Sequence, residues 1–274
     1  MRIYISADIE GIAGVVTREH TRPEGFEYQS ARVWMTDSVA AAANAAFESG
    51  ATEVVISDSH GNMQNLLLDR LPPQVQVVRA SPRPLSMMQG MEVGDYAGAL
   101  FIGYHAGATN PGGILAHTFR SVSLREVRVN GVSVPEAGIN AAIAGHFGTP
   151  VLLVSGDDVC IDETRAFLPD IEAVTVKWAH SRLSARTITP TASYELISAG
   201  VKKAIDRRAS IKPYVIPSPI TLDVNYLYRQ PVEYIALLKG VERLDAFTIR
   251  YIADDILDLQ RFMVFALGYN ATLQ

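Results

Sequence analysis

Short, almost wholly apolar runs recur along the chain and alternate with longer segments of helical pattern. The clearest runs are Ile3–Ala7, Val54–Ser57, Ala99–Gly103 and Val151–Val154. The clearest helical segment is the alanine-rich stretch 30–49, which Gly50 follows where helix ends favour glycine. Strands that are apolar on both faces and alternate with helices are typical of a mostly parallel sheet covered by helices on both faces. The pattern therefore predicts an α/β fold.

A hairpin is predicted near the middle of the chain. Asn130-Gly131 separates two short apolar runs, and this dipeptide favours the tight turns that join antiparallel strands. Pro135 follows where a first helical residue is expected, and a helix should run from there to Gly148.

Three prolines, at positions 213, 217 and 219, mark a break after a further helix predicted over 191–208. The remaining chain has the pattern of strand, helix, strand and helix. We therefore expect two domains, an α/β domain over 1–210 and a smaller C-terminal α/β lobe over 211–274.

Carboxylates and histidines follow the apolar runs or, in one case, the hairpin. These candidate metal ligands are Asp8, Glu10, His60, His105 and Glu136. The carboxyl ends of parallel strands line one crevice in an open α/β sheet, so these side chains should meet there. Carboxylate oxygens and imidazole nitrogens suit a divalent metal, and zinc best. The sequence predicts a metallohydrolase whose site lies in domain 1–210.

Each of these residues also has an ordinary structural interpretation. Acidic residues after strands often cap turns or helices, as Asp58 and Asp157 could. Glu136 lies in a first helical turn, where it would also complement the helix dipole, so a ligand role and a capping role are equally compatible with its position. His117 follows a glycine-rich loop and could overhang the crevice, where a histidine is suited to proton transfer.

The composition of the chain limits which kinds of partner it can bind and in which cellular compartment we expect it. The net charge of -5 and the lack of a Lys/Arg-rich block argue against nucleic acid or an anionic membrane as a partner. No apolar run reaches the length of about 18 residues that spans a bilayer. The single cysteine, Cys160, excludes an intrachain disulfide and fits a reducing compartment, so we expect a cytoplasmic protein.

Six segments together resemble the dinuclear-zinc D-aminopeptidase family. They are SADIEG (6–11), SDSHGNMQNLL (57–67), LFIGYHAGA (100–108), PGGILAHTF (111–119), EAGINAAIAG (136–145) and VLLVSGDD (151–158). The resemblance implies that Asp8 bridges two Zn²⁺ ions per subunit. It further implies that Glu10 and His60 complete one site, that His105 and Glu136 complete the other, and that His117 is catalytic.

The resemblance also implies a substrate and an assembly. The substrates would be short peptides with a free N-terminus, and the N-terminal residue removed would preferentially be a D-amino acid. The assembly would be a homodecamer of two stacked pentameric rings. The stretch RFMVFALGY at 261–269 places bulky groups on more than one side of its predicted helix, too many for a single core face, so we expect the C-terminal lobe to take part in oligomerisation.

A dinuclear site of this kind supplies a metal-bound hydroxide as the nucleophile. We therefore expect His117 to act as a general acid and base rather than to attack the substrate itself.

Two other functions are compatible with parts of the sequence. SDSHGN resembles the strand end of metal-dependent phosphoesterases, but the Gly-Asn-His and Gly-His-x-His segments of that class are missing from the sequence. A non-catalytic metal-binding ring protein is the second alternative.

Overall fold

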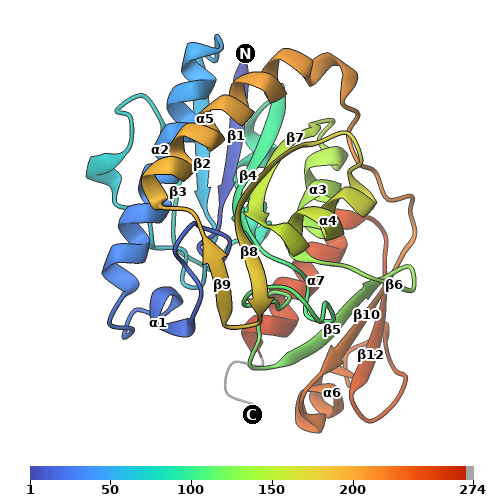
Figure 1. Cartoon of the computed structure of the whole chain (residues 1–274). Coiled ribbons are helices and arrows are strands. Elements are labelled where there is room, and N and C mark those ends of the chain that lie inside the picture. Colours follow the sequence, from blue (N-terminus) through green and yellow to red (C-terminus); the bar gives the residue numbers. More distant parts are fainter. Residues whose placement is uncertain (270–274) are drawn as a thin grey trace.

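A seven-stranded sheet forms the centre of the computed structural model, which describes residues 1–269 (Figure 1). Its strands lie in the order β3-β2-β1-β4-β7-β8-β9. All neighbours are parallel except β9, which runs antiparallel to β8. The bounds are β1 Arg2–Ala7, β2 Glu53–Asp58, β3 Gln76–Val78, β4 Gly98–Tyr104, β7 Val151–Asp157, β8 Glu172–Ser181 and β9 Ser184–Thr187.

Helices cover both faces of this sheet (Figure 1). Helices α2 (Tyr28–Glu48) and α5 (Pro190–Arg207) pack on one face, where Ile3 and Ile5 of β1 join their core. Helices α3 (Glu136–His146) and α4 (Asp158–Phe167) lie on the other face, where Tyr4 points. Successive side chains of a strand point to opposite faces, so β1 is buried on both sides. The short helix α1 (Arg18–Thr21) belongs to the loop after β1.

A second, antiparallel sheet packs beside the first, with the order β11-β12-β10-β5-β6. Its strands are β5 Leu124–Val129, β6 Val132–Ser133, β10 Ile220–Tyr226, β11 Val241–Arg243 and β12 Thr248–Ala253. Helix α6 (Arg229–Ile235) packs on this sheet, and α7 (Ile256–Tyr269) lies between the sheet and α3. No helix among residues 1–269 is long and apolar enough to cross a membrane.

The predicted α/β fold with a mostly parallel sheet is confirmed. The hairpin at Asn130-Gly131 is also present, and both residues have the positive φ that a type I′ turn requires, 50° and 80°. Helix α3 begins one residue later than expected, because Pro135 has an extended backbone and serves as the N-cap. The hairpin β5–β6 lies within the predicted domain 1–210, yet β5 pairs with β10 of the predicted C-terminal lobe. The division into two domains at 210/211 stays a prediction.

Candidate metal centre

Strand order brings the loops after β1, β2 and β4 to one edge of the sheet. Strand β1 lies between the other two, and its last residue, Ala7, is in register with Asp58 on one side and Ile102 on the other. The chain leaves β1 towards β2 and later returns to pair β4 with the opposite edge of β1. Such a reversal of strand order opens a crevice at the carboxyl ends of the strands.

Two glycines allow the loops after β1 and β4 to touch. A Cβ on Gly11 would lie 2.0 Å from the carbonyl oxygen of Tyr104, and one on Gly103 would lie 2.2 Å from that of Asp8. Gly103 also has a φ of +77°, which L side chains rarely adopt. The amide of Gly11 donates to the carbonyl of Gly103 at 2.7 Å. This close approach sets the Asp8–Glu10 segment directly beside His105.

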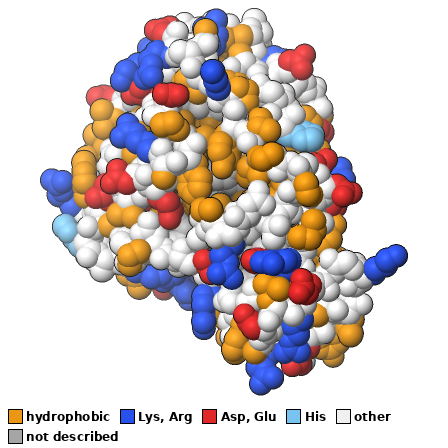
Figure 2. Space-filling model, turned by 90° about the vertical axis from the view of Figure 1, so that its right-hand side faces the viewer, with side chains coloured by type: hydrophobic (Ala, Val, Ile, Leu, Met, Phe, Trp, Pro, Cys, Tyr) orange, Lys and Arg blue, Asp and Glu red, His pale blue; other side chains and the backbone are white. Residues whose placement is uncertain are grey.

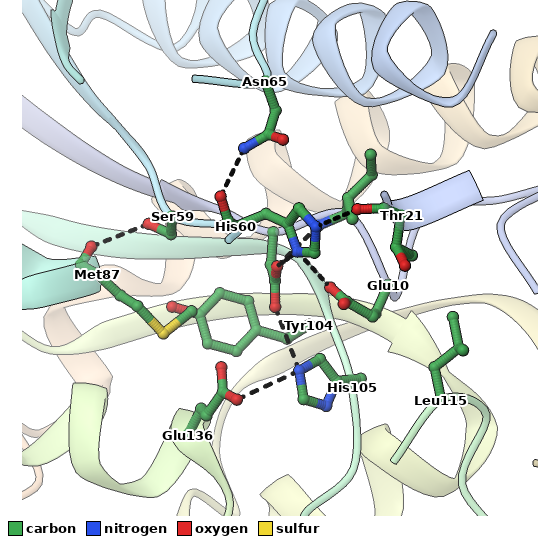
Figure 3. A network of polar contacts seen from close by, with 12 residues as sticks. Glu10, Thr21, Ser59, His60, Asn65, Met87, Tyr104, His105, Leu115 and Glu136 are labelled. Atoms are coloured by element: carbon green, nitrogen blue, oxygen red, sulfur yellow. Dashed lines mark hydrogen bonds and ion pairs between the residues drawn. The ribbon is translucent and has the colours of Figure 1, made fainter. Parts of the chain in front are cut away.

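The five candidate ligands converge on this crevice, with Asp8 at the centre. Its Oδ1 lies 3.3 Å from His60 Nδ1, and its Oδ2 lies 3.4 Å from His105 Nε2. Glu10 Oε2 approaches His60 Nδ1 at 2.9 Å, and Glu136 Oε1 approaches His105 Nε2 at 3.5 Å (Figure 3). The structure thus brings all five residues together in two groups that share Asp8.

Each histidine is oriented by a hydrogen bond from its outer nitrogen to a backbone carbonyl. His60 Nε2 donates to Thr21 at 2.8 Å, and His105 Nδ1 donates to Ala106 at 2.9 Å. The other ring nitrogen of each then faces the carboxylates. Metal-binding histidines are held in this way, with the outer N–H donated and the inner nitrogen left for the ion.

Two buried donor atoms at the centre, Glu10 Oε2 and His105 Nε2, form no well-oriented hydrogen bond among the described residues. Their contacts are the ion pairs with His60, Asp8 and Glu136. Buried polar atoms nearly always form hydrogen bonds or bind an ion, so these two atoms are suited to hold a cation. Two sets of three donor residues, each with ligand atoms within 4.8 Å of one another, are present: Asp8, Glu10 and His60, and His105, His117 and Glu136. The donor chemistry fits a pair of divalent cations.

Charge and burial shift the pKa values of the centre in opposite directions. Burial alone would raise the pKa of Asp8, but hydrogen bonds and charge from His105 and His60 outweigh it and hold that pKa well below its usual value. Burial would lower the pKa of both histidines, but the carboxylates beside them, Glu10 for His60 and Glu136 for His105, raise it well above the usual value. In the metal-free protein the centre is therefore a set of ion pairs.

His117 reaches the centre from the loop between β4 and β5. Its ring stacks on that of His105 with centroids 4.1 Å apart. Its Nδ1 donates to the carbonyl of Leu115 at 2.9 Å, and its Nε2 lies 3.7 Å from Glu136 Oε1. The amide of Phe119 donates to the same Glu136 oxygen at 2.6 Å. The predicted overhang is present, and the geometry suits either proton transfer or a third ligand of the second group.

Comparison with known proteins identifies the family. The D-aminopeptidase family model matches residues 1–265. The chain belongs to the D-aminopeptidase family. A D-aminopeptidase of Bacillus subtilis strain 168 is 31% identical over 265 residues, which is 96% of each chain.

A solved structure supports the same assignment. It is the Zn-dependent D-aminopeptidase DppA from Bacillus subtilis, a self-compartmentalizing protease, with a TM-score of 0.93 and 30% identity. The match covers 98% of the present chain and 97% of the other. The predicted family and the prediction of a metallo-aminopeptidase are thereby confirmed, and the phosphoesterase alternative loses its support.

Other polar residues of this family member have structural roles. Asp58 accepts hydrogen bonds from the amides of Asn65 and Leu66, which fixes the loop after β2 that carries His60. Asp157 caps α4 by accepting from the amide of Cys160 at 2.8 Å. Both match the capping interpretation drawn from the sequence.

The structure adds Lys177, which the sequence analysis did not single out. Its side chain is fully buried in β8, and its Nζ donates to the carbonyls of Glu10, Ile12 and Val15. Burial lowers its pKa to about 8. The sequence does contain a signal for this residue, because Lys177 interrupts the strand pattern VTVKWA. A lysine in such a strand is rarely buried unless it has partners.

Proposed function

We propose that this protein is a zinc-dependent aminopeptidase that removes the N-terminal residue, preferentially a D-amino acid, from short peptides. The observation that supports it most is the position of Asp8, whose two carboxylate oxygens face two separate histidines within a D-aminopeptidase fold. A carboxylate shared in this way could hold two cations side by side, the arrangement found in two-metal hydrolases.

Two zinc ions would be held by the five converging residues. Asp8 would bridge them, with Glu10 and His60 on one ion and His105 and Glu136 on the other. The Zn dependence of the related Bacillus enzyme supports the choice of metal. When bound, such a pair of cations makes water nucleophilic at neutral pH and polarises the scissile carbonyl.

His117 would move the proton. Its Nδ1–H is committed to Leu115, so Nε2 is the nitrogen that can accept a proton from the attacking water. It would then return this proton to the leaving amine, which is general base followed by general acid catalysis. The free N-terminal amine of the substrate would anchor the peptide at the centre, which restricts cleavage to the first peptide bond.

We further propose that the chain assembles into a homodecamer of two pentameric rings, located in the cytoplasm. The self-compartmentalizing character of the Bacillus relative supports a closed assembly. On the face seen in Figure 2, hydrophobic side chains gather around a hollow. A groove of about 300 Å³ runs between the β5–β6 hairpin and the segment 214–217, and its residues Val132 and Val215 are 56% and 63% exposed. Interfaces of obligate oligomers bury apolar surface of this kind.

A matched set of substrates tests the function. Protein purified without chelator is analysed for bound metal and assayed with D-alanyl and L-alanyl p-nitroanilides and with an N-acetylated D-alanyl peptide. We expect zinc in the protein, faster cleavage of the D-substrate, and no cleavage of the acetylated peptide. Absence of metal, or turnover of the acetylated peptide at the same rate, would contradict the proposal. Faster cleavage of the L-substrate would contradict only the stereochemical part.

Asp8→Ala provides the decisive variant, because it removes a donor from both groups at once. We expect loss of both zinc ions and a fall in kcat/KM of at least about 10³-fold, as expected when a hydrolase loses its metals. Asp162→Ala, which removes a solvent-exposed aspartate of α4, is the control and should keep both properties. Full activity in Asp8→Ala would refute the two-metal assignment.

A further inference from the structure

A cleft of about 310 Å³ opens beside the metal centre and is lined by four arginines. They are Arg18, Arg22, Arg120 and Arg182, and they share the cleft with His60 and His117. Among residues 1–269, Glu10, which already belongs to the centre, is the only carboxylate that lines it. The cleft therefore carries a concentrated positive charge at the place where a substrate must enter.

None of these arginines is neutralised by the part of the chain that the structure describes. Their guanidinium groups make no ion pair and no hydrogen bond with residues 1–269, and Arg120 Nε is buried without a partner. Burial, together with the like charges of Arg22 and Arg182, lowers the pKa of Arg18. Like charges held together cost free energy, and guanidinium groups are suited to binding carboxylates in a bidentate manner.

Backbone contacts tie three of these arginines to the residues that position the centre. Arg22 follows Thr21, whose carbonyl accepts from His60, and Arg120 follows Phe119, whose amide donates to Glu136. The carbonyl of Arg182, in the β8–β9 turn, accepts from the amide of Leu115 at 2.9 Å. Leu115 in turn orients His117.

Figure 3 shows Thr21 and Leu115 on the same side of His60 and His105. The backbones of Arg22 and Arg182 are anchored at these two residues, so these arginines begin on that side of the centre.

A second cavity of about 150 Å³ includes the metal centre itself, since Asp8 and Glu136 line it together with His60 and His117. Met63, Met87 and Leu267 form the apolar part of its lining. The two cavities share His60 and His117. A peptide whose N-terminal residue lies at the centre would therefore extend its other end into the arginine cleft.

We propose that the arginine cleft binds the C-terminal carboxylate of the substrate, so that a free-acid peptide is preferred over its C-terminal amide. This inference rests on the proposed aminopeptidase function and adds to it a subsite that recognises charge. Each added residue moves the carboxylate by up to about 3.3–3.6 Å, so the length of the peptide decides whether its carboxylate meets the cleft.

The test compares the free-acid and C-terminal amide forms of D-alanyl-glycine. We expect the wild-type enzyme to favour the acid about 10- to 100-fold in kcat/KM, the range given by hydrogen bonds to charged groups. Arg120→Gln and Arg182→Gln should raise KM for the acid, leave kcat and the amide nearly unchanged, and bring the acid-to-amide ratio towards one. Arg165→Gln, an exposed arginine of α4 outside the cleft, is the control and should keep the ratio.

The outcomes separate this inference from the proposed function. Equal cleavage of acid and amide by the wild-type enzyme, or a ratio that survives in the Arg120→Gln/Arg182→Gln double variant, overturns the carboxylate site and leaves the peptidase standing. If neither form is cleaved, the peptidase function fails, and calorimetric titration with the same two peptides decides on the site. Tighter binding of the acid supports it, and equal binding or none overturns it. Unchanged zinc content and Tm in the variants exclude a folding defect.

Discussion

Adjacent carboxylates raise the pKa of His60 and His105 well above the usual value, which favours a proton on the inner nitrogen of each ring in the metal-free protein. A cation can bind there only by displacing these protons. For the metal-free fold itself, the stabilisation from these ion pairs is complete below a pH of about 6.5 and is lost as the pH rises through the higher folded-state pKa.

Zinc binding to chelator-treated protein should therefore release about two protons at neutral pH. Apparent affinity should rise with pH up to the folded-state pKa of the histidines. Calorimetric titrations with Zn²⁺ in buffers of different ionisation enthalpy measure the number released. An observed enthalpy that does not change from buffer to buffer would contradict the protonated state of the two histidines.

His117→Ala distinguishes a proton carrier from a metal ligand. If His117 moves the proton, the variant should keep both zinc ions while kcat falls about 10²–10⁴-fold, the usual contribution of general acid–base catalysis. Metal analysis and kcat are measured on the same sample. His180→Ala, an exposed histidine at the end of β8, is the control and should behave as wild type. Loss of zinc along with activity would make His117 a ligand of the second group.

At the scale of elements, the loop after β1 is fixed from across the sheet. Lys177 of β8 donates to three carbonyls of the segment 10–15, which holds Glu10 in place. β8 is separated from β1 by β4 and β7, so a long side chain is needed to cover the distance.

Lys177→Met should lower the unfolding free energy by about 2–4 kcal/mol, because buried carbonyls lose their donor. It should also weaken zinc binding at Glu10, whereas a destabilising substitution far from the segment 10–15 should leave zinc binding unchanged. Denaturant unfolding and competition with a metal chelator give the two quantities. Lys203→Met removes a lysine of α5 whose side chain is 63% exposed and serves as the control. Wild-type zinc affinity in Lys177→Met would show that Glu10 is held without it.

The sequence predicts local elements better than their partners. Periodicity and turn chemistry identified the central strands, the long helices and the Asn130-Gly131 hairpin, because these depend on neighbours along the chain. The pairing of β5 with β10 depends on contacts between distant segments, and no pattern within β5 encodes it. At the site, the candidate ligands followed from strand ends. The arginines of the cleft did not, because Arg22, Arg120 and Arg182 lie on loops and Arg18 lies in a helix of only four residues, where no periodic pattern can form.

At the scale of the whole molecule, exposed apolar side chains support the proposed assembly into a closed oligomer. The groove with Val132 and Val215, which are 56% and 63% exposed, is such a surface. The stretch 261–269 also has more bulky groups than one core face can bury, and Tyr269, the last of them, has a side chain that lies outside the described residues.

Light scattering at micromolar concentration should give a mass near ten times the 29.8 kDa of one chain. Val215→Asp introduces a charge into the apolar groove and should shift the mass downward if the groove is an interface. Val93→Asp, at an equally exposed valine of 60% outside the groove, is the control. A mass near that of one chain for the wild type would exclude the ring.

The donors of the metal centre come from four stretches of chain that lie far apart in sequence. Cations held there would join these stretches as covalent bridges join the loops of secreted proteins, although this chain has a single cysteine. Crosslinks between distant residues stabilise a fold largely by lowering the entropy of the unfolded chain. Chelation should therefore lower the Tm of the wild type in scanning calorimetry and leave that of Asp8→Ala unchanged. The ions that serve the reaction would then also stabilise the fold as reversible crosslinks. An equal Tm with and without chelator would show that the fold is equally stable without these crosslinks.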